Sequence, residues 1–327
     1  EARHFILCTD DSHCETLVNE GHVNRALKQA IAHGIPPITA IQMTTLNTAE
    51  HFGVSKDVGM LAPGRYADLL IVPDLVSFTP DQVFAKGRLV AQDQQLAVDI
   101  LAFQYPSWST ASIHLARRLT AEDFCLRVPQ NGSTSGHRIA NVIGVIENQA
   151  PTRHLQLEVN ITDGEIKADL TRDLVKIALV ERHHGTGRIQ LGLVSGFGFG
   201  RSCAIGSTVA HDSHHMILVG SDDVDLALAA NWLAEIGGGQ VVVSQGEVIG
   251  QVALPIGGLM SNQRAEIVAR QAASILDGFK RCGCQLNNPN MQLSLLGLVV
   301  IPELRISDLG LVDVSQFSLI PLIQENS

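Results

Sequence analysis

The sequence has few of the features that mark nucleic-acid-binding or membrane proteins. Only 4% of its 327 residues are aromatic, and the formal net charge is −10, with no basic stripe along the chain. Nucleic-acid-binding proteins need clustered lysine and arginine to neutralise phosphates. No apolar run approaches the roughly 20 residues that a membrane-spanning helix requires. We therefore expect neither a nucleic-acid partner nor a membrane partner.

Cysteines are sparse, and none of the six belongs to a CxxC pair. Cys282-Gly283-Cys284 is a single CxC motif without a second pair, which is weak evidence for a metal site. A signal peptide is not expected either, because only four apolar residues precede Thr9 and Asp10. These features favour a cytoplasmic protein with reduced thiols. An apolar segment that starts at the fifth residue leads us to interpret the chain as the continuation of a longer one.

The residues that are present indicate a folded protein of two or three domains. Hydrophobic residues make up 45% of the chain and charged residues 17%, a balance typical of globular proteins, and the length exceeds that of one ordinary core. In the first segment, residues 1–52, we predict a strand at 5–8, a loop at 9–13 and a helix over 22–33 that stops at Gly34. Pro36-Pro37 opens a second predicted helix that extends to Ala49.

The second segment, residues 53–94, has the pattern of a small β unit. We predict a strand over 67–72 and a hairpin over 83–90, with its turn at Lys86-Gly87. This segment is too short to fold alone and needs partner strands.

The third segment, residues 95–327, has the pattern of an α+β domain, and residues 104–112 are the candidate linker that precedes it. Helical spacing covers 223–236 and 262–279. The longest apolar run, 295–301, is typical of a buried strand. Five other runs predict strands, at 139–146, 155–161, 174–180, 216–219 and 241–243.

A group of polar residues, Thr9-Asp10-Asp11-Ser12-His13, directly follows the first predicted strand. Functional side chains of a barrel of alternating strands and helices emerge where strands end. A carboxylate there can bind a metal ion or serve as a base for metal-bound water. Asp10 or Asp11 can equally cap the turn or helix that follows, and these five residues alone do not separate the two interpretations.

Histidines are concentrated in two short stretches: His183-His184, and His211 with His214 and His215, which together hold five of the 13 in the chain. His211 and His214 are three residues apart, so they can share one face of a turn, with Asp212 available to orient a ring. Imidazole suits zinc, iron and nickel, so metal binding is one interpretation. The other two are side chains that line a site and bind substrate, and buried structural histidines.

Several motifs together resemble the adenine deaminase family of the amidohydrolase superfamily, over essentially the whole chain. The run from Phe5 to Asp11 resembles the eighth barrel strand of amidohydrolases, which ends in a metal-binding aspartate. The passage from Thr45 to Val72 resembles the exit from that barrel into a small β-sandwich. The more specific motifs are the following: Thr9-Asp10-Asp11-Ser12-His13, Glu20-Gly21-His22, Glu181-Arg182-His183-His184-Gly185, Gly196-Phe197-Gly198, and Ser207 to His214.

The resemblance implies a fold and a set of roles. The fold would be the end of a (β/α)8 barrel in residues 1–52, part of a small β-sandwich in 53–94 and a C-terminal α+β domain in 95–327. The activity would be hydrolytic deamination of adenine, with manganese or iron as the divalent metal, in a homodimer. Asp10 would bind the metal and shuttle the proton, with Asp11 and His13 near the substrate ring. The residues expected to line the site are His183, His184, His211, Asp212 and His214.

The chain departs from the family pattern in one important respect, because it contains no HxH pair. Amidohydrolases take most of their metal ligands from earlier strands, and a single aspartate does not hold a catalytic metal. We therefore expect the chain to need an N-terminal barrel segment of the same protein as its partner. Two alternatives remain: another amidohydrolase that acts on a cyclic amide or amidine, and a non-catalytic binding or assembly module.

Overall fold

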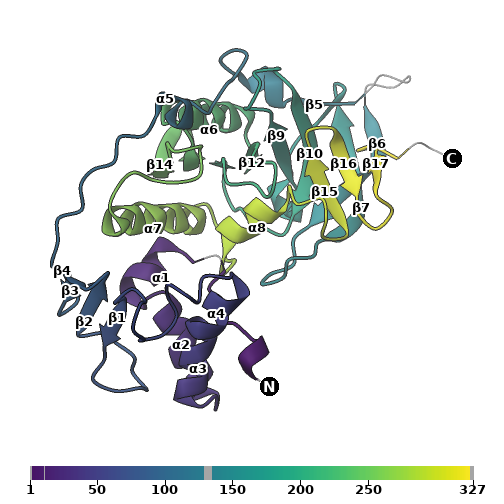
Figure 1. Cartoon of the computed structure of the whole chain (residues 1–327). Coiled ribbons are helices and arrows are strands. Elements are labelled where there is room, and N and C mark those ends of the chain that lie inside the picture. The colour runs from purple at the N-terminus through teal and green to yellow at the C-terminus, as the bar shows by residue number, and fades with distance from the viewer. Residues whose placement is uncertain (1, 11, 129–134, 325–327) are drawn as a thin grey trace. The chain divides into compact units, whose positions relative to one another are not determined.

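The computed structural model describes residues 2–10, 12–128 and 135–324. It is a mixed α/β structure with several sheets, and the chain divides into two compact units. Unit 1 is Glu1–Gln104 and unit 2 is Tyr105–Ser327 (Figure 1). Within the described residues, no helix is long and apolar enough to cross a membrane.

Helices form the first half of unit 1, as the hydrophobic spacing predicts. The predicted helix at 22–33 is α2, and the helix that opens at Pro37 is divided into two at Thr45, whose side chain donates to the carbonyl of Ile41 at 2.6 Å. Such a bond from a threonine to the preceding turn bends a helix. The helical elements are the 3₁₀ turn η1 (Ala2–His4), α1 (Cys14–Asn19), α2 (Val23–Ala32), α3 (Pro37–Thr44) and α4 (Leu46–His51).

The strand predicted at residues 5–8 is not present, and that prediction is wrong for this structure. A strand needs a neighbouring strand to pair with, and no strand pairs with this segment in the described part of unit 1. Instead, the amide of Leu7 donates to the carbonyl of Met43 at 3.1 Å.

The second half of unit 1 is a four-stranded antiparallel sheet in the order β1-β2-β3-β4. Its strands are β1 (Leu69–Ile71), β2 (Gln82–Ala85), β3 (Arg88–Gln92) and β4 (Gln95–Leu96). The predicted hairpin is β2–β3. Its turn residues, Lys86 and Gly87, have φ of 49° and 76°, the left-handed backbone that tight hairpin turns require.

Unit 2 is built on a ten-stranded sheet in the order β14-β13-β11-β12-β9-β10-β6-β7-β8-β5. Neighbouring strands are antiparallel except for β10 and β6, which are parallel. All five predicted strands of this segment are present. The strands are β5 (Leu126–Arg127), β6 (Gly136–Gly144), β7 (Arg153–Thr162), β8 (Glu165–Ile166), β9 (Val175–Val180), β10 (Ile189–Ser195), β11 (Ala204–Ser207), β12 (Met216–Gly220), β13 (Gly239–Ser244) and β14 (Glu247–Ala253).

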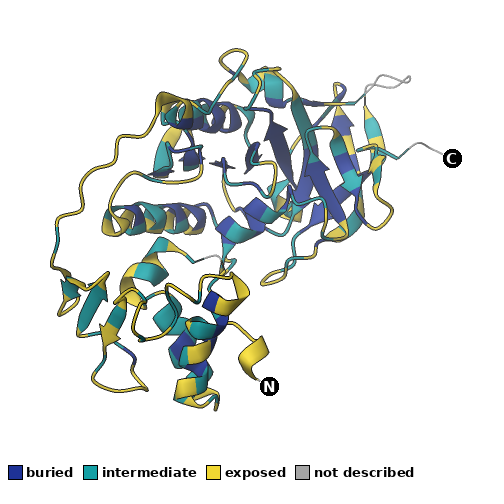
Figure 2. Ribbon diagram, viewed as in Figure 1, coloured by how far each residue is buried: buried dark blue, intermediate teal, exposed yellow. Residues whose placement is uncertain are grey.

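Two helices cover opposite faces of one end of this sheet. Val241 and Val243 of β13 belong to the core beneath α6 (Asp223–Glu235), whereas Val242 between them lies against Gly278 of α7 (Ala265–Arg281). Alternate residues of a strand point to opposite faces, so β13 is buried on both sides. Figure 2 shows the resulting band of buried residues through the middle strands of the sheet. The two helices were predicted from their spacing.

The apolar run at 295–301 was predicted to be a buried strand, and this prediction is also wrong. Helix α8 (Pro289–Leu295) ends there and turns follow. The guanidinium of Arg305, which is fully buried, donates to the carbonyls of Leu295 and Ile301 at 2.8 Å each. These bonds satisfy carbonyls that a strand would have paired with a neighbour. Arg305 itself belongs to a second, three-stranded sheet of β15 (Leu304–Ser307), β16 (Gly310–Asp313) and β17 (Ser318–Ile320).

Candidate functional site

Unit 1 contributes an exposed carboxylate, that of Asp10, in the loop before α1. Helix α1 begins after His13, and the side chain of His13 makes no capping hydrogen bond to it. The carboxylate of Asp10 has no hydrogen-bond or ion-pair partner among the described residues, while the hydroxyl of Thr9 lies 2.8 Å from Nε2 of His22. Asp11 lies outside the described residues. The loop thus leaves Asp10 free to bind a ligand, and His13 is exposed beside it.

The described residues of unit 1 do not form a metal centre by themselves. No three of their histidine, cysteine, aspartate or glutamate side chains lie close enough together to hold one ion. A carboxylate oxygen is a suitable ligand for manganese or iron, so Asp10 fits as one ligand. A catalytic ion needs at least two more protein ligands, and these would have to come from outside the described part of this chain.

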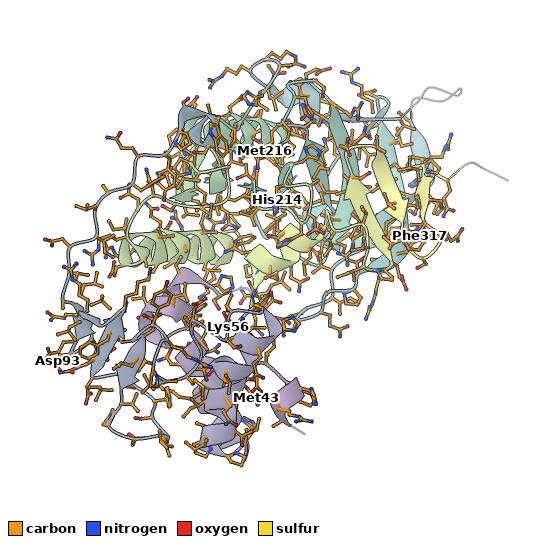
Figure 3. The ribbon with its side chains drawn as sticks, in the orientation of Figure 1. Met43, Lys56, Asp93, His214, Met216 and Phe317 are labelled. Atoms are coloured by element: carbon orange, nitrogen blue, oxygen red, sulfur yellow. The ribbon has the colours of Figure 1, made fainter. Side chains whose placement is uncertain are left out.

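The two histidine stretches of unit 2 meet at one end of neighbouring strands. Strands β9 and β12 are antiparallel, with Val180 opposite Met216. The residues after Val180 and those before Met216 therefore leave the same edge of the sheet. This register brings His183 beside His215, 32 residues away in the sequence. Figure 3 shows His214 in the loop that leads into Met216.

The rings form two pairs. The centroids of His183 and His215 are 4.8 Å apart, with 51° between the ring planes, and those of His211 and His214 are 5.5 Å apart. His184 is exposed, with its ring centroid 6.5 Å from that of His183.

Asp212 is also exposed, and its carboxylate lies 3.8 Å from Nδ1 of His211. All five residues that the sequence predicts to line a site thus lie in ring contact or ion-pair range of a predicted neighbour.

Glu181 fixes the first histidine loop. One carboxylate oxygen accepts the amides of His183 and His184 at 2.5 and 2.8 Å, and the other accepts the amide and hydroxyl of Thr186 at 2.9 Å each. Burial raises the pKa of this carboxyl, but the four hydrogen bonds lower it by more, so that the pKa is about 2. Glu181 is therefore ionised at neutral pH, and its lone pairs serve the backbone instead of a ligand.

Arg182 fixes the second loop. Its side chain is fully buried and donates to the carbonyls of His214 at 2.6 Å, Ser112 at 3.1 Å and Gly257 at 3.1 Å. Three segments distant in the sequence are thereby joined through one guanidinium. Burial lowers the pKa of Arg182 to about 10, so the group stays charged at neutral pH.

Hydrogen bonds determine which ring nitrogens carry protons. Nε2 of His183 lies 2.8 Å from the carbonyl of Ser213, and because a carbonyl only accepts, this nitrogen is the donor. Nδ1 of His214 accepts the amide of Ala210 at 3.2 Å, so its Nε2 carries the proton. Burial lowers the pKa of His214 and of His215, which keeps both rings neutral near pH 7.

A further cluster escaped the sequence analysis. The ammonium of Lys176, almost fully buried, donates to Asp223 at 2.8 Å, to Glu165 at 3.2 Å and to the carbonyl of Phe124 at 3.0 Å. Cys125 lies beside it, and the ligand atoms of Cys125, Glu165 and Asp223 are within 4.8 Å of one another. The ammonium already pairs with both carboxylates, so we interpret this cluster as a network of ion pairs around a buried lysine. Its members come from four separate elements, and no sequence spacing predicts them.

The CxC motif has a structural role. Cys282 and Cys284 are both buried free thiols, and burial raises the pKa of Cys284 to about 11. Neither belongs to a group of three metal-ligating side chains in the described ranges. A separate hollow of about 440 Å³ borders β7 and β8. Acidic and basic side chains line it, among them Glu165 and Lys167, and none of the clustered histidines is among its lining residues.

Both units match families of known proteins. The family profile of the adenine deaminase C-terminal domain matches residues 149–318, and that of the amidohydrolase family matches residues 2–90. Adenine deaminase 3 of Rhizobium meliloti (strain 1021) is 51% identical over 97% of this chain and 53% of its own length. The adenine deaminase of Mesorhizobium japonicum is 50% identical over 98% and 53%, and that of Moorella thermoacetica 46% over 99% and 54%. The chain spans about half the length of these curated relatives.

Proposed function

Because this chain belongs to the adenine deaminase family of the amidohydrolases, we propose that it takes part in the hydrolysis of adenine to hypoxanthine and ammonia. The observation that carries the proposal is the similarity to adenine deaminases, about 50% identity over nearly the whole chain. We propose further that residues 1–52 complete a (β/α)8 barrel, that 53–94 belong to a small β-sandwich, and that an N-terminal segment of the same protein supplies the rest of both.

Several features of unit 1 support a missing neighbour. Phe5, Leu61 and Leu101 are 62%, 71% and 88% exposed, which is costly for large apolar side chains unless another segment covers them. Nη1 of Arg65 is buried and has no hydrogen-bond partner among the described residues. Residues 5–8 likewise lack a neighbouring strand among the described residues. A preceding barrel segment would supply contacts of all three kinds.

The amidohydrolase family implies a divalent metal, and we propose manganese or iron. When bound, such an ion lowers the pKa of a coordinated water and so supplies a nucleophile at neutral pH. Asp10 would hold the ion as one of its ligands. Its carboxylate would also accept the proton of the attacking water and deliver it to the departing amino nitrogen, which must be protonated before it leaves as ammonia. The exposure of Asp10 and its lack of a described partner suit both tasks.

Other residues take supporting roles in this proposal. Asp11 and His13 come shortly after Asp10 in the sequence and would contact ring nitrogens or the tetrahedral intermediate. In unit 2, His183, His184, His211, Asp212 and His214 are proposed as substrate contacts. The imidazole of His214 suits such a contact, because Ala210 occupies its Nδ1 and leaves the Nε2 proton available to a ring nitrogen. The six free cysteines support our proposal of a reducing, cytoplasmic setting. We also propose that the protein is a homodimer.

The test is reconstitution. The chain would be joined behind the preceding part of the Rhizobium meliloti relative, loaded with manganese or iron, and assayed for ammonia release from adenine. We expect turnover by the joined protein and none by the chain alone. Asp10→Asn should abolish turnover, whereas Asp57→Asn, a matched change in the same unit, should preserve it. Equal activity of the Asp10→Asn variant would contradict the assigned role.

A further inference from the structure

The His183–His215 pair has a geometry that its hydrogen bonds do not explain. Both residues are held in place: His183 by Glu181 and Ser213, and His215 by its position directly before β12. His215 is only 8% exposed, yet its Nδ1 is buried with no hydrogen-bond partner among the described residues. Leaving a buried polar atom without a partner costs about 1–3 kcal/mol. Such an atom in a rigid, histidine-rich loop points to a ligand.

We propose that His183 and His215 together bind one transition-metal ion of the class that prefers imidazole, such as zinc, cobalt or nickel. This inference goes beyond the proposed function and does not depend on it. The ligand atoms are Nδ1 of each ring. Where both proposals hold, His183 contributes to the site through the ion instead of touching substrate.

The ring separation fits a shared ion. An imidazole nitrogen lies about 2.0–2.1 Å from zinc, and the ring centre lies roughly 1.2 Å further along the same line. Two rings on one ion at angles between about 90° and 110° then have centroids roughly 4.5–5.3 Å apart. The observed separation for His183 and His215 is 4.8 Å. The 6.5 Å separation of His183 and His184 lies outside this range.

The tautomer of His183 also fits. Its Nε2 proton is committed to the carbonyl of Ser213 at 2.8 Å, so in the neutral ring Nδ1 keeps its lone pair. Metal-bound histidines typically donate their second nitrogen to a carbonyl or carboxylate in this way, which fixes the ring and raises its basicity. His214 in the neighbouring pair lacks this arrangement, because its Nδ1 accepts the amide of Ala210.

The chemistry of the surroundings selects the kind of ion. Two carboxylates act on His215: Asp308 is paired with Arg188 at 3.1 Å, and both oxygens of Glu181 are occupied by backbone amides and by Thr186. The described chain supplies no third cysteine, histidine or carboxylate atom close to the pair. A pair of imidazoles without carboxylates is a poor site for magnesium, calcium or manganese and a suitable one for zinc, cobalt or nickel. The remaining coordination positions would be taken by water or by a small exchangeable ligand.

The experiment titrates the whole chain with Co²⁺ alone and follows its visible absorption, then displaces the cobalt with Zn²⁺. We expect one ion per chain, with affinity reduced at least tenfold in His183→Ala and in His215→Ala, in line with the loss expected when a metal site is disturbed. His137→Ala removes an exposed histidine of β6 and should bind as the unaltered chain does.

Because His215 is buried, its variant can fail to fold, so a second measurement uses the unaltered chain. Ring-nitrogen NMR with Zn²⁺ should shift one nitrogen in each of two histidines, and these should be the two that stop responding in the corresponding variants. Absence of saturable binding, binding that survives His183→Ala, or shifts in His211 and His214 instead would overturn the proposal.

Discussion

The strongest single prediction concerns Arg182, the buried guanidinium that joins the histidine loop to two other segments. Arg182→Met keeps most of the apolar stem but removes the three hydrogen bonds to the carbonyls of His214, Ser112 and Gly257, besides a longer one to the Ser112 hydroxyl. Hydrogen bonds to charged groups contribute about 1.5–3 kcal/mol each, so the loss is roughly 5–9 kcal/mol. The change also removes a buried charge. The lowering of the pKa of Arg182 from 12.5 to about 10 corresponds to about 3 kcal/mol of lost hydration.

The net expectation is therefore a destabilisation of unit 2 by between about 2 and 6 kcal/mol. The assay is urea unfolding followed by tryptophan fluorescence. Both tryptophans of the chain, Trp108 and Trp232, lie in unit 2, so the signal reports on that unit alone. Trp232 packs against the core beneath α6 and is well placed to sense its unfolding.

Arg188→Met is the matched control. Arg188 lies six residues further along, and its side chain is 48% exposed, with one ion pair to Asp308 at 3.1 Å. Pairs of this kind contribute at most about 1 kcal/mol, so the control should unfold close to the unaltered chain. If Arg182→Met lowered the free energy of unfolding no more than Arg188→Met does, the guanidinium would not join the loops as we describe.

Two further predictions concern charged groups of unit 2. The pKa of Glu181 is lowered from 4.5 to about 2 in the folded chain, so its contribution to stability is present above pH 4.5 and is lost as the pH falls towards 2. Urea unfolding of Glu181→Gln between those pH values should therefore show a weaker pH dependence than the unaltered chain, and an identical slope would contradict this. Lys176→Met leaves the carboxylates of Glu165 and Asp223 without their buried counter-ion. It should destabilise unit 2 by about 3–5 kcal/mol in the same assay, and a loss below about 1 kcal/mol would show that the pair is not a stabilising one.

Local patterns predict the elements that depend on local forces. The helix predicted over 223–236 is present because Asp222 caps its first turn, accepting the amides of Val224 and Asp225, and because alanine and leucine, which favour helices, make up most of it. The hairpin at Lys86-Gly87 is present because its turn chemistry is local.

Elements that depend on distant residues were not predictable in this way. Residues 5–8 have the composition of a strand but lack a neighbour to pair with in the described part of unit 1. The run at 295–301 turns because Arg305, further along the chain, binds its carbonyls. Such contacts leave no trace in the spacing of apolar residues.

The candidate site also has features that the sequence predicts and features that only the folded structure reveals. The concentration of histidines is visible in the sequence, but the pairing of His183 with His215 follows from the register of β9 and β12, which no local pattern reveals. The buried Lys176 cluster draws on β8, β9 and α6 and on the segment before β5, so its residues become neighbours only in the folded sheet. The exposure of Asp10 likewise became known only from the structure.

The central proposal is that the chain takes part in the deamination of adenine. The most direct test compares two substrates. The joined protein, loaded with metal, would receive adenine and a cyclic amide such as dihydroorotate in parallel, and both products would be quantified by chromatography. The account predicts hypoxanthine and an equal amount of ammonia from adenine, with no ring opening of the cyclic amide. Ring opening of the cyclic amide without hypoxanthine, or no turnover by a folded and metal-loaded protein, would contradict it.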